Sequence, residues 1–433
     1  MISEALNIND NNHLTIGGVD TLDIVEKYGT PVYVMDEALI RKNCRLYMDS
    51  IRQSCGQNGR VLYASKAFSC LYIYKVIEEE GLGVDVVSGG ELYTAHKAGF
   101  PMEKVYFHGN NKTNDELKLA VDLGVGHIVV DNIFELECLN NIAFEKGVVV
   151  NILFRVKPGI DAHTHDFIMT GQIDSKFGFG LETGEAIEVL HLATKCKNVR
   201  VVGLHCHIGS QIFDKEPFLE AAKVMTNFMA DAYKETGVLL SELNLGGGYG
   251  IRYTETDNPI GYNEYIGDVA ETVRNIAKKR NIPMPFLLME PGRSLVGSAG
   301  ITLYTVGSYK DIPNARKYIS VDGGMADNPR YIMYGAEYTA ILANRVNEKK
   351  NEKVTIAGKC CESGDLLLKD TYLPRVEVGD TLAVLCTGAY NYSMASNYNR
   401  IPKPPVVMVK DKKTKLIIKR ETYDDVIKND ILD

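Results

Sequence analysis

Several residues that could take part in catalysis directly follow apolar, β-branched runs of the sequence. Lys66 follows one such run, a glycine triplet at 246–248 follows another, and Glu290–Arg293 (EPGR) follows a third. Glycines let backbone N–H groups approach a phosphate closely, and arginine adds a planar, positively charged fork. Together these residue types predict a phosphate-binding site with a lysine nearby.

A lysine beside a phosphate site suggests pyridoxal phosphate, a cofactor that binds covalently to a lysine amine. This cofactor also needs an acidic partner for its pyridinium nitrogen, and Glu290 is the candidate. His207 could stack on the cofactor ring. Taken singly, the same features also fit a plain glycine-rich turn, a surface arginine, a solvated lysine and a core histidine.

Two histidine pairs leave a metal-dependent hydrolase open as an alternative. His163 and His165 are two residues apart, and so are His205 and His207. A hydrolytic metal site needs further carboxylate and histidine ligands, and none can be picked out at the later strand ends. We therefore expect no metal.

The elements that must position these residues follow a regular alternation. Apolar, β-branched runs begin near Val61, Val84, Val105, His127, Val148, Val199, Leu243 and Phe286. Helix-like stretches separate them, among them 114–124, 133–147, 217–237 and 266–281. This pattern is typical of a parallel sheet covered by helices, and eight units in ~250 residues match a (β/α)8 barrel. An open, doubly wound sheet is the competing interpretation.

In such a barrel the active site lies at the carboxyl ends of the strands, and the phosphate site is commonly built from the last two loops. The glycine triplet and Glu290–Arg293 would occupy those two loops. After Arg293 the pattern changes to short strands separated by Gly, Pro, Asp and Asn. This change predicts a second, mainly antiparallel β domain.

Composition excludes several classes of protein. The 433 residues include 48 Lys+Arg and 56 Asp+Glu, a net charge of −8, which argues against a nucleic-acid or membrane-surface binder. No apolar run approaches the ~20 residues that span a bilayer, and the polar N-terminus does not resemble a signal peptide. The nine cysteines form no CxxC pair, so we expect a reduced, cytoplasmic location.

An ordered set of motifs resembles the diaminopimelate decarboxylases, in the fold type III, alanine-racemase-like class of pyridoxal-phosphate enzymes. The motifs are YASKAF (63–68), GVDVVSGGEL (83–92), HDFIMTGQIDSKFGFG (165–180), GLHCHIGSQI (203–212), LNLGGGYG (243–250), MEPGRSLV (289–296), GKCCESGDLL (358–367) and GAYNYSMASNYN (388–399). The class fold implies a barrel over 36–294 and a β domain over 1–35 and 295–433 that takes in the N-terminal strand.

The resemblance implies a role for each matching residue. Lys66 would link covalently to the cofactor, and Cys361 would donate a proton. The residues implied in cofactor binding are Lys66, His207, Ser210, Gly248, Glu290, Pro291, Gly292, Arg293 and Tyr390. Those implied in substrate binding are Arg293, Arg330, Tyr334, Glu362 and Tyr390. In this class the Cys361–Glu362 segment reaches into the partner's site, which implies a homodimer.

The implied substrate is meso-diaminopimelate, decarboxylated to L-lysine in the last step of lysine biosynthesis. A site that recognises its distal end needs a cation for the carboxylate and an anion for the amine, and Arg330 with Glu362 supplies both. Tyr331 stands where the family usually has proline. The alternatives are a decarboxylase of another basic amino acid or polyamine precursor, and a non-catalytic, decarboxylase-like regulatory protein.

Overall fold

The computed structural model describes residues 1–160 and 175–432, which form two compact units. The barrel unit comprises Asn43–Gly250 and Pro259–Gly292. The sheet unit comprises Met1–Lys42, Ile251–Asn258 and Arg293–Asp433. The predicted domain boundaries, 36–294 against 1–35 with 295–433, are not tested by this division and stay a prediction.

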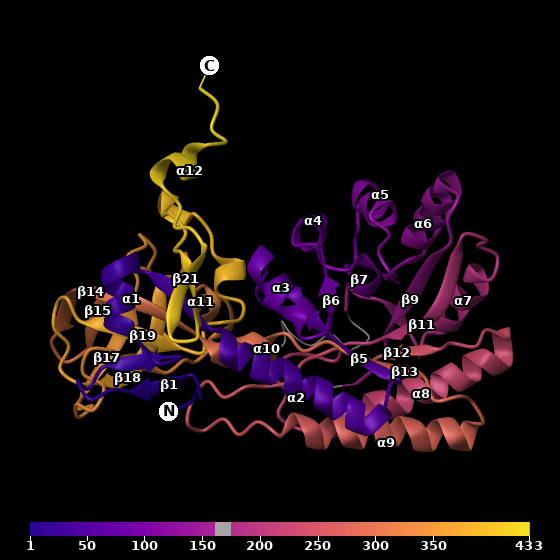
Figure 1. The fold of residues 1–433 in the computed structure, drawn as a ribbon, viewed down its shortest axis with the longest axis horizontal. Helices are drawn as coiled ribbons and strands as arrows, with labels where there is room; N and C mark the ends of the chain where they lie inside the picture. Colours follow the sequence, from indigo (N-terminus) through magenta and orange to yellow (C-terminus); the bar gives the residue numbers. More distant parts are fainter. Residues whose placement is uncertain (161–174, 433) are drawn as a thin grey trace. The chain divides into compact units, whose positions relative to one another are not determined.

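Among the described residues, eight parallel strands close into a ring in the barrel unit (Figure 1). In chain order they are β5 (Gly59–Ala64), β6 (Gly83–Val86), β7 (Val105–Phe107), β8 (His127–Val130), β9 (Val150–Lys157), β11 (Val199–His205), β12 (Glu242–Asn244) and β13 (Phe286–Met289). Pairing of β13 with β5 and of β8 with β9 completes the ring. The predicted (β/α)8 barrel is confirmed, and the open sheet is excluded.

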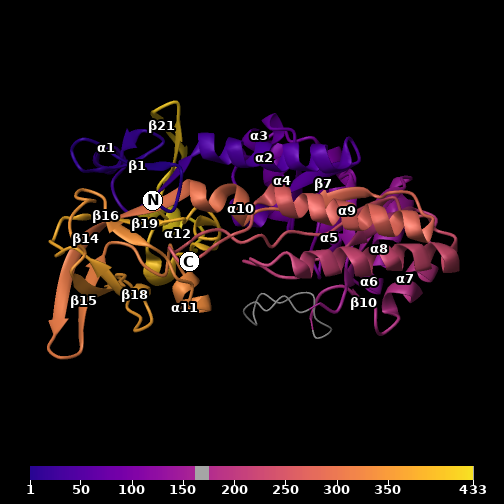
Figure 2. The ribbon, with the colours of Figure 1, turned by 90° about the horizontal axis from the view of Figure 1, so that it is seen from below.

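Helix α2, which precedes β5, and the helices that follow the barrel strands cover the outside of the barrel (Figure 1). They are α2 (Glu37–Cys55), α3 (Leu71–Glu79), α4 (Gly89–Lys97), α5 (Asn114–Asp122), α6 (Ile133–Lys146), α7 (Glu185–Ala193), α8 (Glu216–Thr236) and α9 (Tyr262–Arg280). Short polar side chains start several of them; at α5, Thr113 and Glu116 form a capping box. Helices α8 and α9 pack side by side (Figure 2).

Apolar side chains from the barrel strands fill its interior. One buried cluster contains Leu62, Tyr106, Val129, Leu153 and Leu288. The partly buried side chains of Val202 and Phe286 pack against it. Full burial of a leucine side chain stabilises a fold by about 1.5–3 kcal/mol. This core holds the strand ends, and therefore the residues that follow them, in fixed positions.

The sheet unit is mainly antiparallel and takes in the N-terminal strand, as predicted. Its larger sheet contains β4 (Val32–Asp36), β14 (Gly300–Ile312), β15 (Arg316–Val321), β16 (Ala340–Leu342), β17 (Glu352–Ala357), β18 (Leu366–Leu373), β19 (Thr381–Leu385), β20 (Val406–Lys410) and β21 (Lys413–Ile418). Strand β4 pairs antiparallel with β14 and parallel with β20. A small sheet joins β1 (Leu6–Ile8), β2 (Leu14–Ile16) and β3 (Val19–Asp20).

The remaining α-helices and the remaining strand are short. They are the helices α1 (Thr21–Tyr28), α10 (Arg293–Val296), α11 (Arg330–Tyr334) and α12 (Tyr423–Ile427), and strand β10 (Phe179–Gly180), which pairs with β9. Within the described residues, no helix combines the length and apolar character that crossing a membrane requires.

Replacing Leu288 with alanine should destabilise the barrel by about 2–5 kcal/mol, because it leaves a cavity in the closed core. Urea unfolding followed by circular dichroism measures this loss. Leu192 on α7 is 37% exposed, and Leu192→Ala is the matched control, which we expect to change stability by less than about 0.5 kcal/mol. Equal losses in the two variants would contradict the assigned core.

Candidate active site

Lys66 lies in the short turn that follows β5, at the carboxyl end of the barrel. Its neighbours Ser65 and Ala67 are buried, whereas the lysine itself is exposed. The carbonyl oxygen of Pro291 accepts the backbone N–H of Ala64 (3.1 Å). The first and last strands of the ring are therefore tied together directly beside Lys66.

Glu290 follows β13 and is buried at the centre of a cluster of donors. Nε2 of His108 lies 2.8 Å from Oε1, Nε2 of His205 lies 3.2 Å from Oε2, and Nδ2 of Asn244 donates to Oε1 at 2.6 Å. Burial raises the pKa of Glu290, but His108 and His205 outweigh it and hold the pKa well below its ordinary value. Glu290 is therefore a buried anion, suited to pair with a protonated ring nitrogen.

His108, His205 and Glu290 each offer a donor atom within 4.8 Å of the others, a grouping that could also hold a metal ion. Burial lowers the pKa of His205 to about 3, so its ring is neutral. Both Nε2 atoms face the same carboxylate, at 2.8 Å from His108 and 3.2 Å from His205, and a neutral His205 ring protonated at Nε2 would donate a hydrogen bond to it. The arrangement favours holding a carboxylate over ligating a metal. His163 and His165 lie outside the described residues.

Asp85 supplies a second buried carboxyl group, from the β6 strand. Its Oδ1 lies 3.8 Å from Nε2 of His108. Burial raises the pKa of Asp85 to about 6; His108 and Lys66 oppose that shift, and Glu290 adds to it. Asp85 therefore interacts electrostatically with both Lys66 and the Glu290 cluster.

The glycine triplet forms a tight turn after β12 that only glycine can make. Gly246 and Gly248 have φ values of 70° and 113°, in the left-handed region. A Cβ on Gly247 would overlap the carbonyl oxygen of Glu290. The backbone N–H of Gly247 donates to Nδ1 of His207 at 3.3 Å. The loops after β11, β12 and β13 therefore touch through their backbones.

The loop after β11 carries two further predicted cofactor residues. His207 and Ser210 are half-buried, and Ile212 pairs with Tyr249 in an isolated parallel bridge. Burial, followed by the charges of Lys66 and Arg155, lowers the pKa of His207 well below its ordinary value. A neutral imidazole at this position suits stacking on a protonated aromatic ring. The donor set at this mouth fits a phosphorylated pyridine cofactor.

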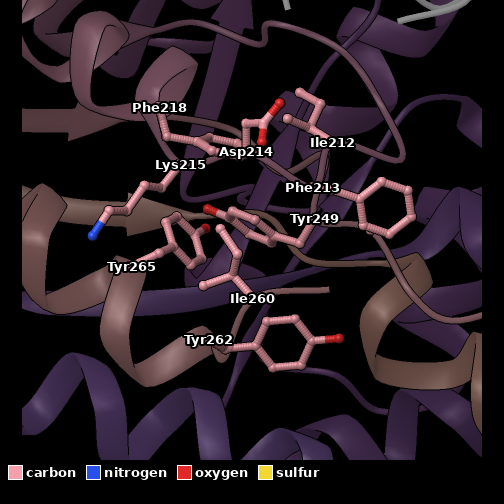
Figure 3. A pocket seen from close by; sticks show the side chains of 10 residues that line it. Ile212, Phe213, Asp214, Lys215, Phe218, Tyr249, Ile260, Tyr262 and Tyr265 are labelled. Carbon is pink, nitrogen blue, oxygen red and sulfur yellow. The ribbon is translucent and has the colours of Figure 1, made fainter. Parts of the chain in front are cut away.

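An aromatic cluster supports the glycine turn from outside, around a small pocket of the barrel unit (Figure 3). The ring of Tyr249, directly after the triplet, lies 4.4 Å from that of Tyr265 and 5.0 Å from that of Phe218. The pocket is lined by Ile212, Phe213, Asp214, Lys215, Phe218, Tyr249, Gly250, Ile260, Tyr262 and Tyr265. This packing fixes the turn that would face a phosphate.

The predicted substrate residues gather in the sheet unit. The guanidinium of Arg293 lies 4.8 Å from the ring centre of Tyr390, and that of Arg330 lies 5.5 Å from the same ring. Arg330 also lies 5.3 Å from the Tyr334 ring. Nη1 of Arg293 donates to the hydroxyl of Tyr253 at 2.7 Å. The guanidinium groups of Arg293 and Arg330, both beside the Tyr390 ring, can bind two carboxylates or hold one carboxylate in a bidentate manner.

Cys361 and Glu362 lie on the loop between β17 and β18, and both side chains are exposed. The predicted residues thus divide into two groups. Lys66, His207, Ser210, Gly248, Glu290, Pro291 and Gly292 belong to the barrel unit. Arg293, Arg330, Tyr334, Cys361, Glu362 and Tyr390 belong to the sheet unit.

Sequence reasoning missed Asn244 and left His108 and His205 without a role. All three face the Glu290 carboxylate at 2.6–3.2 Å. The available signal was a polar residue at the end of an apolar strand, which Asn244 displays in the motif LNLGGG.

The chain is similar to known proteins over nearly its whole length. Residues 37–297 match the family model "Pyridoxal-dependent decarboxylase, pyridoxal binding domain". The chain is 51% identical over 424 residues to the diaminopimelate decarboxylase of Bacillus subtilis, covering 98% of this chain and 96% of the relative. It is 52% identical over 414 residues to that of Bacillus methanolicus, covering 96% of each.

Solved structures give the same result for the fold. Diaminopimelate decarboxylase from M. jannaschii, in complex with L-lysine, superposes with a TM-score of 0.92 at 38% identity, covering 100% of this chain and 99% of that one. The Helicobacter pylori enzyme, also with L-lysine, gives a TM-score of 0.87 at 31% identity over 94% and 98%.

Two groups of the site should act on stability in opposite directions between about pH 4 and pH 6. Asp85 has a raised pKa, so the stability it contributes is lost as the pH rises through about 6. His205 has a lowered pKa, so its contribution is lost as the pH falls below its ordinary value of 6.5. Relative to the wild type, Asp85→Asn should gain stability with rising pH, and His205→Gln should lose it.

The slope of the free energy of unfolding against pH should differ between each variant and the wild type by at most about 1.4 kcal/mol per pH unit. Urea unfolding at a series of pH values measures all three slopes, and each variant serves as the other's control. Slopes that change in the same direction in both variants would contradict the assigned protonation states.

Proposed function

The chain belongs to the diaminopimelate decarboxylase family, and we propose which of its residues perform each part of that reaction. The protein is a pyridoxal-phosphate-dependent carboxy-lyase that converts meso-diaminopimelate to L-lysine and carbon dioxide, the last step of lysine biosynthesis. The assignment of this function rests on the similarity to diaminopimelate decarboxylases over nearly the whole chain.

The barrel unit would hold the cofactor. Bound pyridoxal phosphate accepts the electron pair that the departing carboxylate leaves at Cα. Lys66 would attach the cofactor through its amine, and His207 would cover one face of the ring. The anion of Glu290, supported by Asn244, would keep a proton on the ring nitrogen. The backbone N–H groups of Gly248 and Gly292, with the Ser210 hydroxyl, would face the phosphate, and Pro291, which has no N–H, would hold Gly292 in place.

The sheet unit would recognise the substrate. Arg293, Arg330 and Tyr334 would bind carboxylate oxygens through charge-assisted hydrogen bonds, and Tyr390 would touch both cofactor and substrate. Glu362 would bind the distal ammonium. A lysine or ornithine substrate has no distal carboxylate, so Arg330 selects diaminopimelate over both.

Cys361 would return the proton that replaces carbon dioxide at Cα, because a thiol is a competent general acid. Its exposure, with that of Glu362, supports a site completed between two copies of the chain, and we propose a homodimer. We also propose a cytoplasmic location, which the nine cysteines support, all free within the described residues.

Replacing Lys66 with alanine should lower kcat for formation of the product, L-lysine, at least a hundredfold, because the amine that attaches the cofactor is lost. The assay supplies pyridoxal phosphate and, in separate reactions, meso-diaminopimelate, L-lysine, L-ornithine or L-arginine, and measures carbon dioxide and amine product. Wild type should act on diaminopimelate alone. Lys75→Ala, at an exposed lysine on α3, is the control and should keep full activity. Full activity of Lys66→Ala would overturn the assignment.

Replacing Arg330 with methionine should lower kcat/KM for diaminopimelate by roughly 10- to 100-fold, the cost of about 1.5–3 kcal/mol for one charged hydrogen bond. Arg316→Met, which removes a cation paired with Asp370 on the same unit (2.9 Å), is the matched control. Steady-state kinetics on both variants measures the difference. An unchanged KM and kcat in Arg330→Met would remove this arginine from the substrate site.

A further inference from the structure

Three loops of the sheet unit carry the proposed substrate and proton-donor residues. The first loop, 322–330, ends at Arg330; the second loop, 358–365, carries Cys361 and Glu362; the third loop, 386–400, carries Tyr390. Cys361 and Glu362 are exposed, so packing does not fix their positions. Something else must hold the backbone of the second loop.

The carboxylate of Asp365 joins the second loop to the first. Asp365 is only 3% exposed. Its Oδ2 accepts the backbone N–H of Cys360 at 2.7 Å, and its Oδ1 accepts that of Met325 at 2.6 Å. The backbone approaches so closely here that a Cβ on Gly324 would lie 2.6 Å from Oδ1. One buried carboxylate therefore fixes the distance between these two loops.

Asn399 joins the third loop to the second. Its Oδ1 accepts the backbone N–H of Cys361 at 2.7 Å. Asn399 has a φ of 53°, a left-handed conformation that asparagine tolerates better than most residues. The backbone N–H of Ser396 donates to the carbonyl oxygen of Ala326 at 2.8 Å, which joins the third loop to the first. Each of the three loops is therefore tied to the other two.

We propose that Asp365 and Asn399 are positioning residues of the decarboxylation, acting on the consecutive N–H groups of Cys360 and Cys361. Asn399 fixes the peptide plane that precedes Cys361, and the bond from the Glu362 N–H to the carbonyl oxygen of Cys360 (2.8 Å) fixes the plane that follows it. These two planes set the direction of the Cys361 side chain, and Asp365 anchors the neighbouring residue Cys360. The inference rests on the proposed function, in which Cys361 gives its proton to Cα. A misplacement of about 1 Å at such a group can cost a hundredfold in rate.

Asn399→Gly is the sharpest test, because glycine keeps the left-handed backbone and removes only the acceptor. We expect kcat to fall roughly 10- to 100-fold. Lysine formed per carbon dioxide released should also fall below one, because a displaced thiol delivers its proton to Cα less reliably. Asn399→Asp restores an acceptor oxygen on a residue that tolerates this backbone, and should recover most of both losses.

Asn12→Gly is the matched control. Asn12 also has a left-handed backbone, with a φ of 65°, and its Oδ1 also accepts a backbone N–H, that of Asn347 at 2.8 Å. It lies between β1 and β2, outside the three loops. Asn12→Gly should therefore keep the wild-type kcat and the wild-type ratio of lysine to carbon dioxide.

Amide hydrogen exchange of the peptide containing 358–365 tests the hydrogen bond without reference to turnover. In the full chain, Asn399→Gly should exchange faster at the Cys361 amide, and Asn12→Gly should not. Faster exchange with unchanged kcat and product ratio would overturn the positioning role, and so would unchanged exchange. A wild type that releases no lysine would instead overturn the proposed function, while the exchange comparison still tests the contact.

Asp365→Asn is the second variant and should lower kcat at least as much, because one carboxylate oxygen becomes an NH2 group that faces a backbone N–H. Its far-ultraviolet circular dichroism shows whether it folds. A folded Asp365→Asn with wild-type kcat would remove Asp365 from the proposal. Where the variant does not fold, the comparison of Asn399→Gly with Asn399→Asp decides.

Discussion

A carboxylate buried in a barrel must be compensated by hydrogen bonds and positive charge, and Glu290 is compensated from three other strands. Asn244 ends β12, His205 ends β11 and His108 follows β7, and all three direct nitrogen atoms at its two oxygens. Losing one partner of a buried charge typically costs 3–5 kcal/mol. The position of this anion is therefore a property of the closed barrel and not of any one loop.

Closure of the ring has a second consequence for the site. The β13 strand must lie beside β5, so Glu290 and the turn that carries Lys66 become neighbours although they are far apart in the sequence. The glycine triplet follows β12, on the other side of β13, and packs closely against Glu290 because Gly247 has no side chain to clash with the Glu290 carbonyl oxygen. Under the proposed function, the carboxylate that would pair with a ring nitrogen and the amine that would attach the ring thus come from adjacent strands.

The sequence predicts the barrel well because its strands are apolar throughout and regularly spaced. The predicted helices 114–124 and 217–237 agree with α5 and α8 within two residues. The partners of Glu290 could not be predicted in the same way. His108, His205 and Asn244 lie at or just after the ends of strands whose relative register comes from ring closure, and that register cannot be read from a single sequence. Likewise, the parallel pairing of β4 with β20 depends on tertiary contacts alone.

The two units place different physical demands on the same chemistry. The barrel unit must keep charge stable away from water, so its polar groups are buried and satisfied by side chains on rigid strands. In the proposed reaction the sheet unit would present a thiol and a carboxylate to a substrate that enters and leaves, and the exposure of Cys361 and Glu362 suits that role. An exposed loop gains little order from packing, and the order must come from hydrogen bonds to its backbone. Asp365 and Asn399 supply such bonds at two successive residues, Cys360 and Cys361, directly before Glu362.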